Sequence, residues 1–577
     1  MNDFYLTINL QSLNDPICQP QNLHYTFSKQ YERDSFLYKE DGDFLLFIGV
    51  CHNKTELFPT SAKNWPENMF FSFKASRKSL LEHLSGYFCG LYYDAKNRDV
   101  VLFSDHLTTI PVYYYRHNNF FVVDTNLFRL AQELRRLGQP IQLSEFGAYA
   151  MLTYSFMLDN YTLLADVYKV RPASIYSFRD NRTEKYFEFY SDEKQTLSKD
   201  SIAEGIDYHF SQSIRDSFSL DNPNSHLLTL SGGLDSRMCL FYALKCGFQN
   251  ITTLNYSQSF YREELIAKKI ATDYHCEHIF FSLDNGRYLS NIDEGICATQ
   301  GMTTYRPILS ARMVWKQLQL DRYNFVHSGM LGDTILGGYC IDKCNPDNSF
   351  HSPIDFAVQL NPKNKSILSS QYKNDFIPLF EKILDWIPES KLSLLHSEKY
   401  ILDNRYINGL MQSALGTRDI TVLSSPYVSK PLMKFIYSFP SSLRVNHELY
   451  FTWMNTYMPQ ATKYVWENTG LKPIYGKIKV KPHSMLSSLY KHADACLHPM
   501  RPERSRNPYN YWMKHNEHIQ KELYDYCNEK MYLIEGYSEL HSVSCRILRR
   551  NNIYLLIRLA TLLGFFYMCQ HDNSEVL

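Results

Sequence analysis

A short loop of glycine and serine in the middle of the chain has the residue types of an anion-binding site. Its sequence, SGGLDS, occupies residues 231–236, between an apolar run at residues 226–230 and a helical pattern that starts near Met238. A strand, a tight turn and a helix in this order leave backbone N–H groups at the positive end of the helix dipole, and glycine lets a phosphate approach the backbone. We therefore expect a phosphate site built from Leu230, Ser231, Gly232, Gly233 and Ser236.

The carboxylate inside this loop suits a metal ion better than it suits the phosphate itself. Asp235 offers the hard oxygen ligand that Mg²⁺ prefers in proteins. The loop holds no Gly-Lys-Ser/Thr sequence, so it is not a Walker A loop. The pattern therefore predicts a nucleotide site of another class, with a metal ion at Asp235.

A parallel sheet is needed to bring this loop close to others. Alternating strand and helix patterns after residue 202 predict a doubly wound α/β fold, in which ligands bind at the carboxyl ends of the strands. Two further loops begin at such ends, so we expect Asn255, Ser328 and Gly329 to complete the nucleotide site. The predicted strands are at residues 226–230, 251–256, 278–283 and 324–327, and the predicted helices include 263–274 and 309–317.

The first 190 residues have a different pattern. Short strand-like runs separated by turns, with two helical segments, predict an α+β region rich in antiparallel strands. The polar stretch at residues 191–199 is typical of a linker, so we expect domains at residues 1–190 and 200–577, the latter mostly helical after about residue 355. The strand-like runs are 44–50, 88–93, 100–103, 112–115 and 120–123, and the helical segments are 127–137 and 143–152.

Composition narrows the classes of function. The 577 residues carry 60 basic and 60 acidic side chains, and zero formal net charge argues against a nucleic-acid partner. The 13 cysteines, with no secretory pattern at the N-terminus, indicate reduced thiols and a cytoplasmic location. The apolar stretch at residues 553–568 contains Arg558 and is shorter than the roughly 20 residues of a bilayer span, so we expect a buried terminal helix and no membrane contact.

Several segments together resemble the asparagine synthetase-like family, which includes β-lactam synthetases and lasso-peptide cyclases. Residues 86–94 and 104–114 resemble its class II glutamine amidotransferase-like domain, an antiparallel sandwich of the Ntn-hydrolase type. Residues 231–236 match the family's PP-loop, and residues 328–339 resemble its second metal loop. The resemblance implies an amidotransferase-like domain followed by a PP-loop synthetase domain. It also implies ATP and Mg²⁺ as cofactors, with Asp235 and Asp333 as metal ligands.

The resemblance also implies the reaction. A small-molecule or peptide carboxylate would be activated as an acyl-adenylate with release of pyrophosphate, and ammonia or an amine would then displace AMP. A late lysine stabilises this step in the family; we expect Lys472 to be this lysine, with Lys477 and Lys479 as alternatives. A homodimer, or a separate subunit that supplies ammonia, would be compatible with this scheme.

Two departures from the family pattern affect this expectation. Glutamine-hydrolysing members have a cysteine after the initiator methionine, whereas this chain has Asn2, so we expect no glutaminase activity of its own. The second metal loop has Met330 where a carboxylate or a tyrosine is usual, Leu331 where a glycine is usual and Thr334 where an acid is usual. We expect Met330 to line the acceptor pocket, where a thioether packs against carbon but cannot accept a proton.

Two other functions remain open at this point. One is a macrolactam- or β-lactam-type cyclase, which closes an internal amide and needs no glutaminase. The other is a non-catalytic binding or scaffold protein, suggested by the absent nucleophile and the altered loop. Retention of Ser231, Asp235 and Asp333 favours an enzyme, since these residues would be eroded first in an inert descendant.

Overall fold

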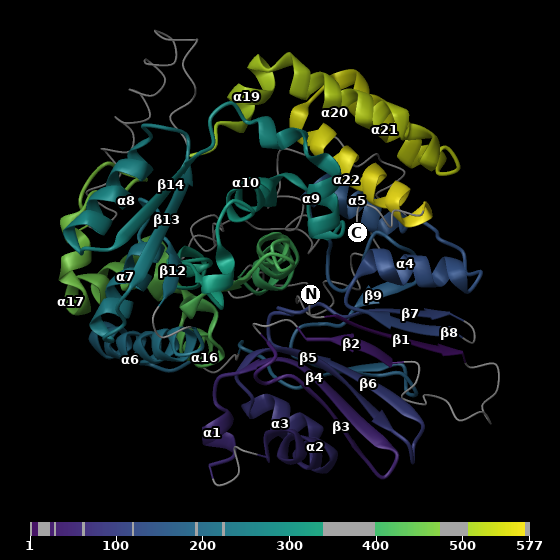
Figure 1. Ribbon diagram of the computed structural model, residues 1–577, viewed down its shortest axis with the longest axis horizontal. Coiled ribbons are helices and arrows are strands. Elements are labelled where there is room, and N and C mark those ends of the chain that lie inside the picture. Colours follow the sequence, from purple (N-terminus) through teal and green to yellow (C-terminus); the bar gives the residue numbers. More distant parts are fainter. Residues whose placement is uncertain are drawn as a thin grey trace.

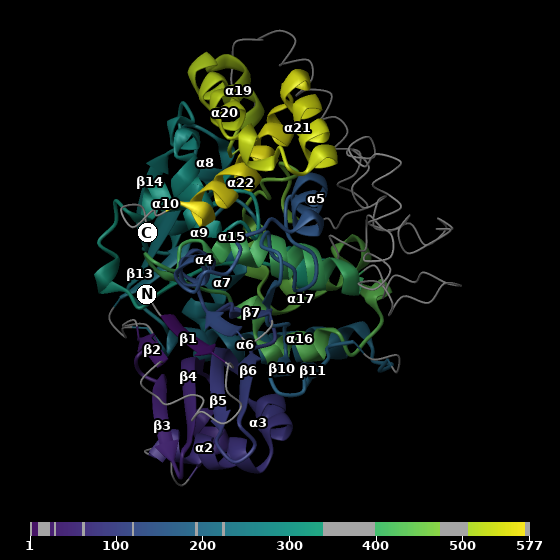
Figure 2. The ribbon, with the colours of Figure 1, turned by 90° about the vertical axis from the view of Figure 1, so that its right-hand side faces the viewer.

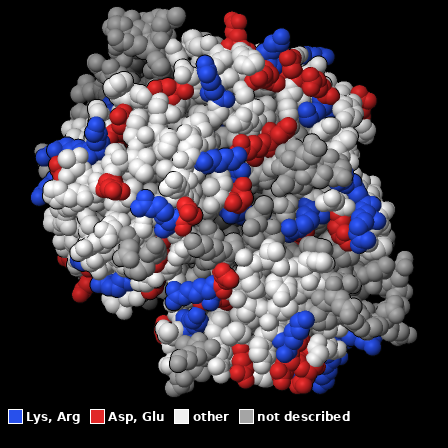
Figure 3. All heavy atoms as spheres, in the orientation of Figure 1, with Lys and Arg blue, Asp and Glu red and all other residues white. Residues whose placement is uncertain are grey.

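The computed structural model shows an antiparallel region followed by a parallel sheet and many helices (Figure 1). It describes residues 3–9, 23–27, 31–59, 64–117, 120–190, 194–221, 225–337, 398–473 and 506–571. This arrangement confirms the predicted order of an α+β part and an α/β part. On the face shown in Figure 3, acidic and basic side chains are interspersed rather than gathered by sign.

Two antiparallel sheets form most of the region before residue 190. One has the order β2 (Leu23–Thr26), β1 (Asp3–Asn9), β8 (Phe120–Asp124), β7 (Tyr113–His117) and β9 (Val167–Lys169). The other has the order β11 (Arg182–Lys185), β10 (Ser174–Ser177), β6 (Asp99–Ser104), β5 (Gly86–Asp94), β4 (Asp43–Cys51) and β3 (Phe36–Glu40). Each strand predicted in this region is present, with ends shifted by at most two residues.

Alternation along β4 explains why the two sheets pack face to face. Leu46 and Ile48 lie in one apolar cluster with Phe121 and Val123 of the other sheet. The neighbouring side chain of Phe47 belongs to a second cluster, which includes residues of α2 (Trp65–Ala75) and α3 (Arg77–His83). Side chains in a strand alternate between the two faces with a period of two. The middle strands are therefore buried on both sides, by a sheet and by helices.

A five-stranded parallel sheet forms the centre of the second half. Its order is β14 (Glu277–Ser282), β13 (Ile251–Ser257), β12 (His226–Thr229), β15 (Phe325–His327) and β16 (Val422–Ser424), and all four pairings are parallel. The chain runs outward from β12 in both directions, so the order reverses at β12. In such sheets a crevice for ligands forms at the carboxyl ends of the strands beside this reversal. The helices α7 (Asp235–Lys245), α8 (Arg262–Asp273) and α10 (Arg306–Trp315) connect the strands.

The chain ends in a group of helices, drawn in yellow tones in Figures 1 and 2. They are α19 (Tyr509–His515), α20 (Glu517–Glu529), α21 (Ser538–Arg550) and α22 (Ile553–Gln570). Among the described residues, α22 alone is long and apolar enough to cross a membrane, but 72% of it is buried inside the protein. Arg558 on this helix donates to the carbonyl oxygens of Leu152 and Thr153, at 2.8 and 3.0 Å. The predicted buried terminal helix is therefore present.

Hydrogen bonds join the antiparallel region to the segment that follows β16. The ammonium group of Lys430 donates to the carbonyl oxygens of Leu81, Glu82 and Leu84 at the end of α3. The imidazole Nε2 of His106 donates to the carbonyl oxygen of Val428 at 2.8 Å. These bonds fasten the antiparallel sheets to the edge of the parallel sheet.

The buried carboxylate of Asp221 connects two neighbouring strands of the parallel sheet, β12 and β15. Asp221 Oδ2 accepts from His226 Nδ1 at 3.2 Å and from His327 Nε2 at 3.1 Å, and Oδ1 accepts from the Asn324 N–H at 2.8 Å. All three side chains are buried, and the histidine donors hold the pKa of Asp221 well below its usual range. We explain this triad by its hydrogen bonds.

We expect Asp221→Ala to lower the free energy of unfolding by about 3 kcal/mol, because three buried donors lose their acceptor. Urea unfolding followed by tryptophan fluorescence measures the change. The matched control is Asp180→Ala, at an exposed aspartate, which is expected to stay within about 0.5 kcal/mol of the parent protein. Equal unfolding midpoints for the two variants would contradict this account of the triad.

Candidate functional site

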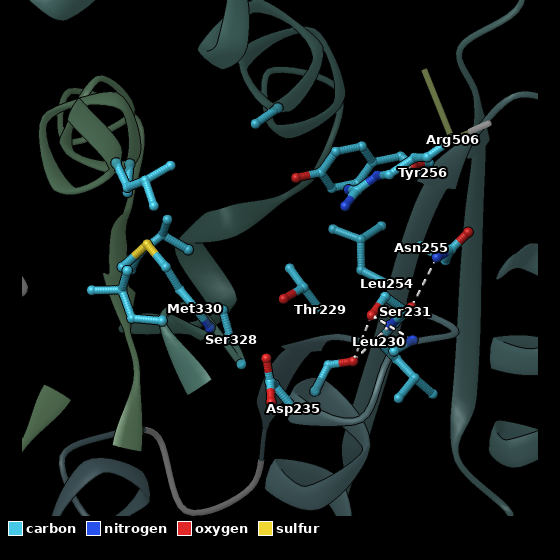
Figure 4. Close-up of a pocket in the computed structure, with 18 of the residues that line it drawn as sticks. Thr229, Leu230, Ser231, Asp235, Leu254, Asn255, Tyr256, Ser328, Met330 and Arg506 are labelled. Atoms are coloured by element: carbon cyan, nitrogen blue, oxygen red, sulfur yellow. Dashed lines mark hydrogen bonds between the residues drawn. The ribbon is translucent and has the colours of Figure 1, made fainter. Parts of the chain in front are cut away.

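A pocket of about 510 Å³ opens at the carboxyl ends of β12, β13 and β15. Its wall includes most of the loop after β12, the end of β13, the loop after β15 and one side of α10 (Figure 4). The wall also includes residues of η7 (Ile401–Met411), a π-helix, and of α15 (Gln412–Leu415). Parallel strands therefore bring together loops that lie about 100 residues apart, as the sequence pattern predicts. The predicted residues in the wall are Leu230, Ser231, Gly233, Asp235, Ser236, Asn255, Ser328, Gly329, Met330 and Asp333.

The loop after β12 is closed by its own serines. The hydroxyl of Ser236 accepts the Ser231 N–H at 2.9 Å, and the two serine hydroxyls are 2.9 Å apart. The Gly233 N–H donates to Ser231 Oγ at 3.2 Å. These bonds hold the backbone in a tight turn at the start of α7, so the loop is shaped before a ligand arrives.

Arg237 fastens this loop to a distant part of the chain. Its side chain is fully buried and donates to the carbonyl oxygens of Gly232, Ala461, Tyr464 and Val465, at 2.7 to 3.2 Å. Gly232 faces this packing rather than the pocket, and a Cβ there would lie 2.8 Å from the Cβ of Glu467. Of the predicted phosphate-loop residues, Gly232 is therefore the one that does not line the pocket.

Two aspartates meet at the lower rim of the pocket. Asp235, the first residue of α7, accepts the backbone N–H of Asp333 at 2.8 Å, and His447 Nε2 contacts the carboxylate of Asp333. Burial, together with the negative charge of Asp333, raises the pKa of Asp235 to about 7. Two adjacent carboxylates that repel each other are a suitable donor set for a divalent cation. The structure therefore places the two predicted metal ligands beside each other.

The loop after β15 is pressed against the loop after β12. A Cβ at Gly329 would lie 2.3 Å from the backbone nitrogen of Ser236, and a Cβ at Gly332 would lie 2.5 Å from Cγ of Asp235. Between them, Leu331 adopts φ = +67°, a conformation that costs a residue with a side chain. A glycine would adopt this conformation without strain, which explains why glycine is usual at this position in the family that the loop resembles.

The upper side of the pocket is polar. The Asn255 amide donates to the Leu230 carbonyl oxygen at 2.9 Å and to Glu263 Oε1 at 3.2 Å. Arg506 Nε donates to the Tyr256 carbonyl oxygen at 3.1 Å, and its guanidinium lies 4.4 Å from the centre of the Tyr256 ring. Figure 4 shows Arg506, Tyr256 and Asn255 on the same side of the pocket.

Three further residues line the pocket that the sequence pattern does not predict as site residues, which are Tyr256, Glu263 and Arg506. Glu263 and Tyr256 lie beside a predicted loop, so their positions at the end of a strand and the start of a helix were the available signal. Arg506 comes from a segment 250 residues away in the chain from Tyr256, and nothing in its local sequence indicates that contact. Among the described residues that line the pocket, Arg506 is the one cation.

Of the three predicted late lysines, Lys472 is the one that lies within the described residues. Lys472 is exposed and is absent from the pocket wall, so the structure does not bring it to the site. Lys477 and Lys479 lie outside the described residues. Met330, in contrast, lines the pocket on the side opposite Asn255 and Tyr256, as Figure 4 shows.

Comparison with known proteins finds a family model that matches the middle of the chain. Residues 208–463 match the family model described as asparagine synthase, and this range holds nearly all of the pocket wall. A curated protein, "Amidase chry2" from Gibberella zeae, is 27% identical over 165 residues. That match covers 27% of this chain and 23% of the relative, so the chain spans less than a quarter of the relative's length in this match.

Proposed function

We propose that the chain is an ATP-dependent ligase that forms amide bonds, and the match of residues 208–463 to the asparagine synthase family model supports this proposal. The acid substrate would attack the α-phosphorus of ATP, so that pyrophosphate leaves and an acyl-adenylate forms. Ammonia or an amine would then displace AMP. One observation carries the proposal: a preformed phosphate-type loop, a pair of aspartates and a substrate-sized cavity share one pocket.

The pocket has the features that ATP requires. The serine bonds at Ser231 and Gly233 shape the turn that leads into α7, and the first turn of α7 has backbone N–H groups suited to a polyphosphate. Glycine at position 329 lets the second loop approach to a distance that any Cβ would prevent. Arg506 supplies a positive charge on the polar side, which would offset charge on the phosphates or on the leaving pyrophosphate.

Asp235 and Asp333 are the residues that would hold Mg²⁺. Bound there, Mg²⁺ would withdraw electron density from the phosphorus that the acid attacks. Asp235 must be ionised for this role, and its raised pKa means that a proton and a cation compete for the carboxylate near neutral pH. The Asp333 N–H and the phenol of Tyr427, which donates to the Asp235 carbonyl oxygen at 3.2 Å, fix the position of Asp235.

Exchange of labelled pyrophosphate into ATP tests this proposal. We expect exchange that depends on both Mg²⁺ and a carboxylic acid, because adenylate formation is reversible while the product stays bound. Calorimetric titration with MgATP, which we expect to give saturable heat, separates an enzyme from an inert scaffold. An absence of exchange with every acid tested, combined with an absence of saturable heat, would contradict the proposal.

We further propose that residues 1–190 form a class II amidotransferase-like domain that has lost its activity, and that residues 200–577 form the synthetase domain. The two face-to-face antiparallel sheets before residue 190 support this assignment. Position 2, where the family has its nucleophilic cysteine, holds Asn2. In this proposal the nitrogen comes from free ammonia, from an amine or from another subunit.

We expect the purified protein to hydrolyse glutamine at the background rate. An amide cannot act as an N-terminal nucleophile. Two thiols of the antiparallel region are not activated, because burial raises the pKa of Cys51 to about 12 and Cys89 is fully buried. Release of glutamate from glutamine, measured with a coupled dehydrogenase, checks this expectation. A clear rate that disappears in Cys18→Ser, Cys51→Ser or Cys89→Ser would show that another thiol has taken over the reaction.

A further inference from the structure

The pocket has an apolar wall opposite its polar side. Figure 4 shows Met330 facing Tyr256, Asn255 and Arg506 across the cavity, with Thr229 and Asp235 between them. Met330 and five further apolar side chains of the lining are called the apolar wall here; the five are Ile308, Ala311, Trp315, Leu410 and Leu423. A ligand that spans the cavity therefore meets Arg506 on one side and the thioether of Met330 on the other.

Packing and hydrogen bonds hold several residues of the apolar wall in place. Ile308 and Trp315 lie on α10 and are 3% and 1% exposed, so their rotamers are held by packing behind them. The carbonyl oxygen of Met330 accepts the hydroxyl of Ser425 at 2.7 Å, which fixes the backbone from which its side chain extends. The wall is therefore a formed surface and does not need a ligand to assemble it.

Leu410 stands out in this wall because it is an exposed leucine. Its side chain is 44% exposed although it lines the cavity, and it sits near the end of the π-helix η7. π-Helical turns are uncommon and occur often at functional sites. An apolar ligand in the cavity would cover this surface and gain hydrophobic contact.

Met330 connects the apolar wall to the proposed reaction centre. Its neighbour Gly329 lies against the start of α7, and Asp333, three residues later, contacts Asp235 through its N–H. A carboxyl group placed near these loops would direct its carbon chain toward Met330 and Leu410. Charged atoms on that chain would find no opposite charge there, because the charged residues among the described lining are Asp235, Glu263, Asp333 and Arg506, and none belongs to the apolar wall.

We propose that the acid substrate has an apolar, uncharged carbon skeleton that packs against Met330 and Leu410. The α-ammonium and second carboxylate of an acidic amino acid such as aspartate would face hydrocarbon in this position. This inference rests on the proposed adenylation activity and names the substrate class of the same site. Met330 and Leu410 are then the residues that select the substrate.

Pyrophosphate exchange with matched acids tests this inference on the full-length protein. Hexanoate and 3-phenylpropionate are compared with aspartate and glutamate at equal concentration. We expect the apolar acids to have at least a tenfold higher kcat/KM than the charged ones. A higher value for aspartate or glutamate would overturn the inference while leaving the proposed function intact.

Substitution of the wall provides the second arm of the test. Leu410→Lys and Met330→Lys place an ammonium group in the apolar wall, so the preference for hexanoate over its diacid analogue adipate should fall at least tenfold. The matched control is Leu265→Lys, at a leucine of α8 that is 57% exposed and lies outside the pocket, where the preference should not change. Because Leu410 is already exposed, its lysine variant should fold, and a thermal unfolding curve checks this.

Each outcome decides between the two proposals. An unchanged preference in both folded lysine variants would overturn the role of the wall. ATP binding without exchange by any apolar acid would overturn the substrate class. An absence of both ATP binding and exchange would overturn the proposed function. It would also overturn the inferred substrate class, which rests on that function.

Discussion

Asp235→Asn is expected to lower the rate of ATP–pyrophosphate exchange by about a thousandfold or more. Loss of a metal ligand costs several kcal/mol of transition-state stabilisation, and about 4 kcal/mol corresponds to three orders of magnitude. The amide oxygen can still accept the Asp333 N–H, which is 2.8 Å from the carboxylate in the parent protein. The variant therefore loses charge while it keeps the local geometry.

The same substitution should stabilise the protein in the absence of metal. A carboxyl group whose pKa is raised by folding binds its proton more tightly in the native state, so stability falls as pH rises from about 4 through the folded pKa. For Asp235 that folded value is about 7. In EDTA, the parent protein should lose stability between pH 5 and pH 8, whereas the asparagine variant should not lose this contribution.

Asp180→Asn is the matched control for both measurements, because Asp180 is exposed and lies outside the pocket. Exchange in this variant should equal that of the parent protein, and its pH dependence of unfolding should be unchanged. Parent-level exchange in Asp235→Asn would mean that Asp235 is not a metal ligand. Parallel pH profiles of unfolding for the parent protein and Asp235→Asn would mean that folding does not raise the pKa of Asp235.

Gly329→Ala is expected to lower exchange at least about a hundredfold. The added Cβ would lie 2.3 Å from the Ser236 nitrogen and 2.5 Å from the carbonyl carbon of Asp235, and both atoms belong to the backbone. The two loops must therefore separate, and a displacement of about 1 Å in reacting groups can cost two orders of magnitude in rate. Exchange kinetics and a thermal unfolding curve measure the two consequences separately.

Gly536→Ala serves as the control for this substitution. A Cβ at Gly536 has no heavy atom within 4 Å, and its backbone does not need a positive φ. Exchange by this variant should match that of the parent protein. Full exchange by a folded Gly329→Ala protein would show that the two loops need not touch for the reaction.

Local pattern was sufficient to predict most of the regular structure. The apolar runs at residues 226–230 and 251–256 became β12 and β13, and the helical pattern at 263–274 became α8, with boundaries shifted by one residue. These elements are long or strongly apolar, and their periodicity survives in the fold because each packs on the same core. Element boundaries shifted more at α10, which begins at Arg306 rather than at residue 309, because Pro307 initiates the helix before its apolar pattern starts.

The loops of the site were predictable for a related reason. Parallel strands carry their following loops to one edge of the sheet, so Ser231, Asn255 and Ser328 converge once the strands are assigned. Asp235 and Asp333 meet there as well. Their expected role as metal ligands comes from the resemblance to the family. Their closeness follows from the parallel sheet, which brings both loops to the same edge.

Other parts of the site depend on contacts that local sequence does not encode. Arg506 reaches Tyr256 across 250 residues of chain, and Leu410 arrives on a π-helix that no periodicity predicts. Lys472 was expected from its position in the family pattern, yet it is exposed and outside the pocket wall. Long-range packing decides such placements, and one sequence contains no direct signal for it.

Identification of the phosphorus-containing products tests the central claim most directly. The protein is incubated with MgATP, an apolar acid and hydroxylamine as a trapping amine, and the products are resolved by phosphorus NMR. The account predicts acid-dependent formation of AMP and pyrophosphate in equal amounts, together with the hydroxamate of the acid. Formation of ADP and phosphate, or consumption of ATP that does not depend on the acid, would contradict it.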